Sequence, residues 1–288
     1  MSIFGIGTVV VDHAVELSHY PAEDTKGEVQ HQWVQVGGPV PIALSTAAYY
    51  GSSTALLSRW GQDSAGELIR QTLTERSINL DHCQSSADWS SGFAHVWVTA
   101  ETGCRTIAFS RGSFPPPDEL DVSETMLKNC RILHLDGWAS AAAIKAAQIV
   151  RNKGGMVVLD AGSVKPGLNA LLPLVDILIA SALFRRSRFG SAEVSHDDLL
   201  SLGPSDVIST DGANQSTWLT KETAFHEPAV DVHAIDTNGA GDIFSGAILQ
   251  ALEKRRSPKE SQTFANSVAG YACGQRGNFR LTEWTFPD

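Results

Sequence analysis

The sequence predicts an α/β fold in which a mostly parallel central sheet is covered by helices on both faces. From Ala55 onward, short apolar runs with the length of buried strands alternate with amphipathic helical segments, a pattern typical of parallel sheets. Three aspartates, Asp12, Asp136 and Asp242, lie at or near the ends of such runs. Ligands of open α/β sheets bind at the carboxyl ends of the strands, so we expect these carboxylates to gather there.

The chain of 288 residues suits one large domain, residues 1–288, and its 42% hydrophobic and 19% charged residues are ordinary for a globular protein. A net charge of −10 argues against a nucleic-acid-binding surface. No signal peptide and no membrane-length apolar run is visible. We therefore expect a cytoplasmic protein with no membrane or nucleic-acid partner. Four widely spaced cysteines are expected to be buried free thiols: Cys83, Cys104, Cys130 and Cys273.

Residues 3–12 are interpreted as one buried strand that ends in Asp12. Gly5 and Gly7 could begin a dinucleotide-binding turn, but Val10 stands where the third glycine is required. Of the functions that the sequence suggests, an NAD-dependent oxidoreductase is therefore the least favoured.

The remaining elements follow in chain order. Gly37-Gly38-Pro39 begins a helix that runs to about Tyr50 and is closed by Gly51. Ser64 and Glu67 form a predicted capping box for a helix to Arg76. Further strands are expected at 55–60, 131–135, 156–160 and 176–179, with helices at 141–153 and from Ser257 to near Gly274.

Two segments, about 14–36 and 92–110, are expected to form short strands outside the main sheet. Residues 93–98 and 105–109 flank Glu101-Thr102-Gly103, which indicates a hairpin. These strands carry apolar residues that we expect to be exposed, namely Val29, Trp33, Val96 and Trp97. An exposed sheet of this kind is expected to be covered by a second copy, which predicts a homodimer.

The segment from Asp236 to Gly246 is the most informative one. Gly239-Ala240-Gly241 precedes a long apolar helix, and the free amides of such a glycine-rich helix N-terminus form an anion-binding site. Asp242, in the first turn, could accept a proton from an attacking hydroxyl. The alternative is that Asp242 only caps the helix.

This Asp-Thr-x-Gly-Ala-Gly-Asp segment closely resembles the C-terminal signature of the PfkB/ribokinase family of carbohydrate kinases. The resemblance implies a ribokinase-like, Rossmann-type three-layer sandwich with a β-sheet lid formed by the two segments above. It further implies ATP-dependent phosphorylation of a hydroxyl on a sugar or sugar-like molecule, with Mg²⁺ and a monovalent cation such as K⁺ as cofactors.

Site residues are carried over from the family by position. Asp242 would be the catalytic base, residues 239–241 the anion hole, and Asp236 would lie near the monovalent-cation site. The acceptor would contact Asp12, Asp136 and the Gly37-Gly38 pair, and Arg105 matches an arginine near the phosphates. Thr210, Gly212 and Asn266 would line the nucleotide.

The chain departs from the family at two places. Ile42 replaces an asparagine that bonds sugar hydroxyls, which predicts an acceptor with fewer hydroxyls, or an apolar substituent, on that side. Ser181 to Phe184 replaces an Asn-x-x-Glu motif that organises Mg²⁺. These departures motivate the alternative function, a protein that binds nucleotide or sugar without efficient turnover. Three nearby arginines are expected to be solvated rather than to face phosphates: Arg185, Arg186 and Arg188.

Overall fold

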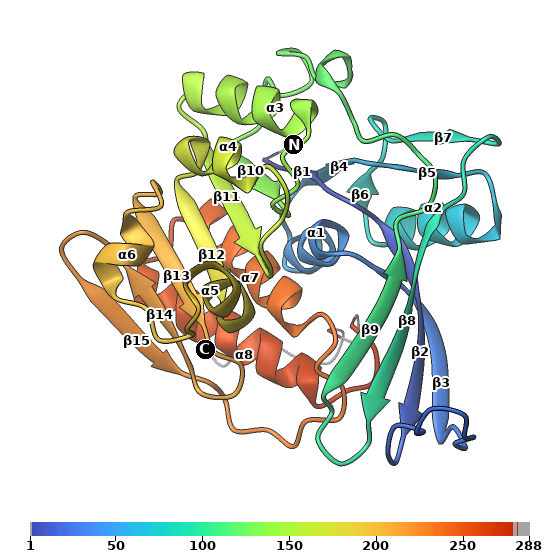
Figure 1. The fold of residues 1–288 in the computed structure, drawn as a ribbon. Helices are drawn as coiled ribbons and strands as arrows, with labels where there is room; N and C mark the ends of the chain where they lie inside the picture. The colour runs from blue at the N-terminus through green and yellow to red at the C-terminus, as the bar shows by residue number, and fades with distance from the viewer. Residues whose placement is uncertain (1, 279–280, 282–288) are drawn as a thin grey trace.

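The computed structural model describes residues 2–278 and 281. Its main sheet confirms the predicted fold class, because every pairing from β6 to β13 is parallel and only the β13–β14 and β14–β15 pairings are antiparallel (Figure 1). In spatial order the strands are β15 (Ala224–Pro228), β14 (Gln215–Leu219), β13 (Asp206–Thr210), β12 (Ile177–Ser181), β11 (Met156–Ala161), β10 (Ile132–Leu135), β1 (Ile3–Ile6), β4 (Thr54–Leu57) and β6 (Ile78–Asn79).

Helices cover both faces of this sheet. Alternate residues of each strand point to opposite faces, so Ile3 and Leu56 join one buried cluster and Phe4 and Ala55 join another. The first cluster packs under α1 (Pro39–Tyr49), α2 (Ser64–Glu75), α7 (Ala240–Glu253) and α8 (Pro258–Cys273). The second packs under α3 (Ala141–Asn152), α4 (Leu168–Leu171), α5 (Ala182–Phe189) and α6 (His196–Leu200).

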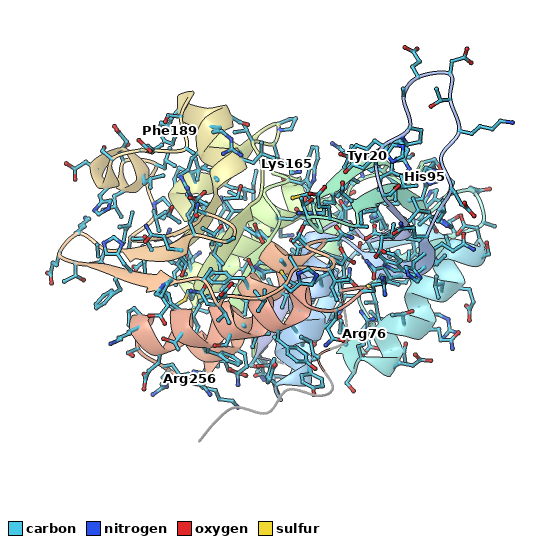
Figure 2. All side chains as sticks on the ribbon, turned by 90° about the horizontal axis from the view of Figure 1, so that it is seen from below. Tyr20, Arg76, His95, Lys165, Phe189 and Arg256 are labelled. Atoms are coloured by element: carbon cyan, nitrogen blue, oxygen red, sulfur yellow. The ribbon has the colours of Figure 1, made fainter. Side chains whose placement is uncertain are left out.

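A smaller four-stranded sheet, the lid sheet, extends from the edge of the main body (Figure 1). Its order is β3 (His31–Gly37), β2 (Val10–Leu17), β8 (Gly92–Thr99) and β9 (Arg105–Ser110). Figure 2 shows His95 on this sheet and Lys165 near its junction with the main body. Of the residues expected to be exposed, Val29 and Trp97 are 42% and 41% exposed, whereas Trp33 is half-buried and Val96 is fully buried.

The expected single strand at 3–12 is wrong. β1 ends at Ile6 and β2 begins at Val10, so Asp12 belongs to the lid sheet. Gly5 and Gly7, which precede β2, allow close packing of α1 and do not form a dinucleotide-binding turn. A Cβ on Gly5 would lie 2.4 Å from Val40 Cγ1, and one on Gly7 would lie 2.5 Å from Val40 Cγ2. Glycine here lets α1 approach the end of β1 closely.

Three smaller expectations also need correction. The run at 55–60 divides into β4 and β5 (Arg59–Gly61), which pairs with β7 (Gln84–Ser86) in a separate ribbon. Asp63 rather than Ser64 caps α2, since its Oδ1 accepts a 2.8 Å hydrogen bond from Gly66 N. All four cysteines are free, but Cys104 is exposed and the other three are only partly buried.

Two further expectations hold. Ser257 and Glu260 form the capping box of α8, and Gly51, with φ of +84°, follows the end of α1. Within residues 2–278 and 281, no helix is long and apolar enough to cross a membrane.

Candidate active site

A cavity of about 310 Å³, the first cavity, lies between the lid sheet and the carboxyl end of the main sheet. Seven residues singled out from the sequence border it: Asp12, Gly38, Ile42, Arg105, Asp136, Gly239 and Asp242. The expectation that the three strand-end carboxylates meet is therefore confirmed, although Asp12 arrives from the lid sheet. Lys165, Trp138 and Asn238 also border this cavity and were not singled out from the sequence.

The N-terminus of α7 forms part of the wall of the first cavity. Gly239 is the N-cap residue, with φ of +79° and no side-chain cap, so the interpretation that Asp242 caps the helix is wrong. A Cβ placed on Gly241 would find no atom within 4 Å, which leaves the backbone of the first turn open to a ligand. The exposed amides and the helix dipole make this turn suitable for an anion.

Asp242 stands one turn into that helix, beside other carboxylates. Burial raises its pKa well above the usual value, and the neighbouring Asp160 carboxylate raises it further, while Arg105 opposes the shift. A carboxylate with a raised pKa is a stronger proton acceptor near neutral pH.

Asp160, at the end of β11, was missed by the sequence reasoning. Its Oδ2 accepts a 2.7 Å hydrogen bond from Ser245 Oγ on α7, and burial raises the pKa of Asp160 to about 6. The signal was available, because Asp160 ends its strand as Asp136 ends the neighbouring strand. The hydrogen bond between Asp160 and Ser245 connects the main sheet to the helix that carries Asp242.

Asp12 is held where the lid sheet meets the main body. Its carboxyl group is buried, which raises its pKa to about 6, and Oδ2 accepts a 3.1 Å hydrogen bond from Asn238 Nδ2. Gly37 makes room for it, because a Cβ at Gly37 would lie 2.4 Å from Asp12 Oδ1. The Gly37-Gly38 pair therefore supports the site through packing at the first glycine and direct lining at the second.

Asp136 fixes two loops at the border of the first cavity. Its Oδ2 accepts a 3.1 Å hydrogen bond from Thr8 N, and its Oδ1 accepts one of 3.2 Å from Trp138 N. Each carboxylate oxygen has a second lone pair, so Asp136 can still accept a hydrogen bond from a ligand hydroxyl. Burial raises the pKa of Asp136.

Asp236 lies behind the first cavity, not on its wall. Its Oδ1 accepts from Asn238 N at 2.8 Å and its Oδ2 from Gly277 N at 3.0 Å, so the carboxylate fixes the turn before α7. The next residue, Thr237, donates from its backbone N and its Oγ1 to Gly103 O at the tip of the lid hairpin. In the described part of the chain, no group of three or more His, Cys, Asp or Glu side chains could hold a metal ion.

The residues expected to contact nucleotide do not border the first cavity; they lie at the end of β13, just after it, and on α8. Thr210 ends β13, and Gly212, with φ of +55°, leaves open space around its Cα. Asn266 donates from Nδ2 to the carbonyls of Glu227 and Pro228, at 3.2 and 2.9 Å.

The arginine run is only partly solvated. Arg186 and Arg188 are exposed, but Arg185 is 5% exposed and donates to the carbonyls of Ala180 and Thr210. The interpretation of Arg185 as a solvated charge is wrong, because its guanidinium joins the ends of β12 and β13. Phe184, which replaces a family glutamate, is fully buried in the core.

The chain is similar over nearly its whole length to known sugar kinases. A ribokinase from Haemophilus influenzae is 25% identical over 289 residues, which cover 94% of this chain and 92% of that protein. A mouse ketohexokinase is 22% identical over 303 residues, covering 96% of this chain and 97% of that protein.

A solved structure of Arabidopsis thaliana ribokinase complexed with ribose and ATP superposes with a TM-score of 0.80, at 22% identity and 99% coverage of both chains. The solved adenosine kinase of Sinorhizobium meliloti gives a TM-score of 0.83 at 18% identity, covering 96% of this chain and 95% of that one. The pfkB family carbohydrate kinase model matches residues 6–283, and the protein therefore belongs to the pfkB family of carbohydrate kinases.

Proposed function

We propose that this protein transfers the γ-phosphoryl group of ATP to a hydroxyl of a sugar or sugar-like acceptor. The observation that carries the proposal is the meeting of Asp242 and the open N-terminus of α7 with Asp12, Asp136 and Arg105 around one cavity. Phosphoryl transfer depends mainly on positioning and on charge stabilisation, and this arrangement supplies both.

In the proposed reaction, Asp242 accepts the proton of the acceptor hydroxyl as its oxygen forms a bond to the γ-phosphorus. The bond from the γ-phosphorus to the β–γ bridging oxygen breaks, and ADP leaves. The amides of residues 239–241 stabilise the charge that develops on the phosphoryl oxygens. Arg105, on β9 of the lid sheet, adds positive charge from the opposite wall.

The acceptor would be oriented by Asp12 and Asp136, whose carboxylates accept hydrogen bonds from hydroxyls. Ile42 also borders the first cavity, and its side chain offers no polar atom. This supports an acceptor with fewer hydroxyls, or an apolar group, on the side that faces Ile42.

The residues present fit ATP with Mg²⁺. Thr210 ends β13 and Gly212 follows it; we propose that both line the nucleotide, with Asn266 beside the base. Mg²⁺ is usually held by one or two carboxylates together with phosphates and water rather than by an all-protein cage, which suits the scattered aspartates here. When bound, it would neutralise phosphate charge. Asp236 would support a K⁺ site by fixing the surrounding turn.

A coupled assay of ADP release over pentoses, hexoses, ketoses and nucleosides tests this proposal. We expect acceptor-dependent ADP release with at least one of them, and release slower by about 10²–10⁴ from Asp242→Asn under the same conditions. Calorimetric binding of ATP and of an acceptor, with ADP release no faster than in the acceptor-free control, would instead favour the alternative of a protein that binds without turnover.

A further inference from the structure

A second cavity, of about 290 Å³, adjoins the first cavity. Four residues border both of them: Thr8, Arg111, Asp136 and Trp138. Because the cavities share these walls, a molecule that is bound beside Asp136 in the first cavity can extend into the second.

The lining of the second cavity is mostly hydrocarbon. Its apolar residues are Ile6, Phe114, Pro116, Pro117, Ala139 and Pro166. Two of the hydroxyl side chains that face it already make hydrogen bonds within the protein. Ser58 donates from Oγ to Gly7 O at 2.7 Å, and the Oγ of Ser140 accepts from Ala143 N at 3.1 Å as the cap of α3. A ligand hydroxyl placed beside Ser58 or Ser140 would therefore compete with a hydrogen bond that the protein already makes.

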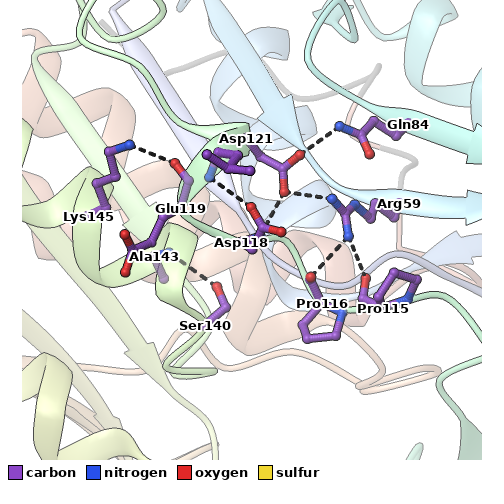
Figure 3. A network of polar contacts seen from close by, with 11 residues as sticks. Arg59, Gln84, Pro115, Pro116, Asp118, Glu119, Asp121, Ser140, Ala143 and Lys145 are labelled. Atoms are coloured by element: carbon purple, nitrogen blue, oxygen red, sulfur yellow. Dashed lines mark hydrogen bonds and ion pairs between the residues drawn. The ribbon is translucent and has the colours of Figure 1, made fainter.

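The proline wall of the second cavity is fixed by a buried ion pair (Figure 3). Arg59 donates from Nη1 to the carbonyls of Pro115 and Pro116, at 3.2 and 3.0 Å, and from Nη2 to Asp121 at 2.6 Å. Both charged side chains of this pair are 8% exposed. Prolines add stiffness of their own, so the wall is present before a ligand arrives, and little ordering cost opposes binding.

A stacked pair of side chains stands at the border between the cavities. The guanidinium carbon of Arg111 lies 3.3 Å from the ring centroid of Trp138, and Lys165 Nζ lies 5.3 Å from the same centroid. Aromatic rings and flat guanidinium groups provide broad, rigid contact surfaces. A planar group that passes this border would therefore find flat surfaces beside it.

We infer that the acceptor is a two-part, glycoside-like molecule, with a hydroxylated ring in the first cavity and an apolar ring substituent in the second. This inference rests on the proposed function and specifies its acceptor. The aspartates of the first cavity suit hydroxyls, and the apolar residues of the second, with Trp138 at its border, suit an unsubstituted or heteroaromatic ring.

A negatively charged substituent fits the second cavity less well. Arg59 is already paired with Asp121, and Arg111 lies flat on Trp138. Arg111 is a cation at the border of this cavity, but burying a phosphate against the apolar residues of the second cavity removes its hydration, which is costly. Sugar phosphates are therefore expected to be poorer acceptors than neutral aryl glycosides.

Matched acceptor pairs test the inference: inosine against ribose, and phenyl β-D-glucopyranoside against glucose. In the ADP-release assay, the substituted member of at least one pair should have a kcat/KM at least about tenfold higher, as expected for burying an aromatic ring. Near-equal values within both pairs would overturn the inference, as would a preference for ribose 5-phosphate or glucose 6-phosphate.

Phe114→Ala tests whether the second cavity is responsible. It should lower the preference for the substituted member about tenfold, whereas Leu120→Ala, at a 93% exposed position in the same segment, should leave the preference as it is. An unchanged preference in Phe114→Ala would overturn the inference.

Calorimetry separates this inference from the proposed function. If no acceptor is phosphorylated, tighter binding of inosine or phenyl glucoside than of the parent sugar, weakened by Phe114→Ala, would support the second cavity while refuting the kinase reaction. Equal binding within both pairs would refute the second cavity as well.

Discussion

Asn238 Nδ2 donates a 3.1 Å hydrogen bond to Asp12 Oδ2 across 226 positions of the chain. One residue belongs to the turn before α7, and the other belongs to strand β2 of the lid sheet. The contact therefore joins the proposed anion hole to the proposed acceptor-binding carboxylate. Thr237, the preceding residue, makes a parallel connection to Gly103 of the lid hairpin.

Asn238→Ala should weaken acceptor binding more than it slows the chemical step. Loss of the amide removes one of the hydrogen bonds to the buried Asp12 carboxylate and leaves that from Gln35, and a lost hydrogen bond to a charged group costs about 1.5–3 kcal/mol. We expect KM for the acceptor to rise about tenfold or more, with a smaller change in kcat, in steady-state assays. Asn214→Ala, at an exposed turn, is the matched control. A variant with unaltered KM would show that the contact does not position Asp12.

Asp242→Asn should abolish most turnover and leave folding nearly intact. The substitution removes the proton acceptor but keeps the size of the side chain, and loss of a general base typically costs about 10²–10⁴ in rate. Steady-state kcat, the thermal midpoint and ATP affinity should be measured together. Retention of most of the wild-type kcat would refute the role proposed for Asp242.

Asp160→Asn should stabilise the protein more at pH 8 than at pH 5. The pKa of Asp160 is about 6 in the folded protein against an ordinary value of 3.8, so the folded state holds the proton more tightly. Stability is then lost as pH rises between these two values. The variant has no carboxyl group at this position and does not lose stability in this way. Its free energy of unfolding relative to that of the wild type should therefore rise by about 1–2 kcal/mol from pH 5 to pH 8.

Denaturant unfolding of both proteins at the two pH values measures that difference. Asp231→Asn, at an exposed position, controls for replacing an aspartate by an asparagine. An equal effect of Asp160→Asn at both pH values would contradict the assignment of a raised pKa.

Ile42→Asn should shift selectivity toward acceptors with more hydroxyls. Ile42 is 2% exposed and borders the first cavity, so the new amide would face hydroxyls that the wild-type wall cannot bond. The ratio of kcat/KM for ribose or fructose to that for the best wild-type acceptor should rise. Ordinary efficiency of the wild-type protein with ribose or fructose would show that the inference from Ile42 is wrong.

The lid sheet is proposed to pair with a second copy. Its outer face presents Val34, Phe93 and Trp97, which are 54%, 40% and 41% exposed, and such a patch is usually covered. Light scattering at micromolar concentration should give the mass of a dimer, and Trp97→Glu should shift the mass toward the monomer. A wild-type monomer would contradict the pairing.

Much of this site was encoded locally in the sequence. The glycine-rich turn before α7 and the carboxylate at the end of β10 depend on short stretches whose backbone demands are met by the residues themselves. Hydrophobic periodicity determined the main sheet in the same way, because strands buried on both faces must be apolar throughout.

Other features were decided only by tertiary structure. Asp12 was assigned to the wrong strand, since the break after Ile6 reflects the close approach of Val40 to the glycines rather than any turn residue. Arg185 was expected in solvent, but two strand ends offered carbonyls to its guanidinium.

The hydrogen bond from Asn238 to Asp12 and the second cavity behind Trp138 likewise join segments that lie far apart in sequence. The sequence by itself determined the family, the sheet and the residues of the anion-binding turn, because these follow from local patterns. Which of those residues meet, and what lies beside them, was decided by packing between distant segments, because it depends on side-chain volume and on donors and acceptors that no local pattern specifies.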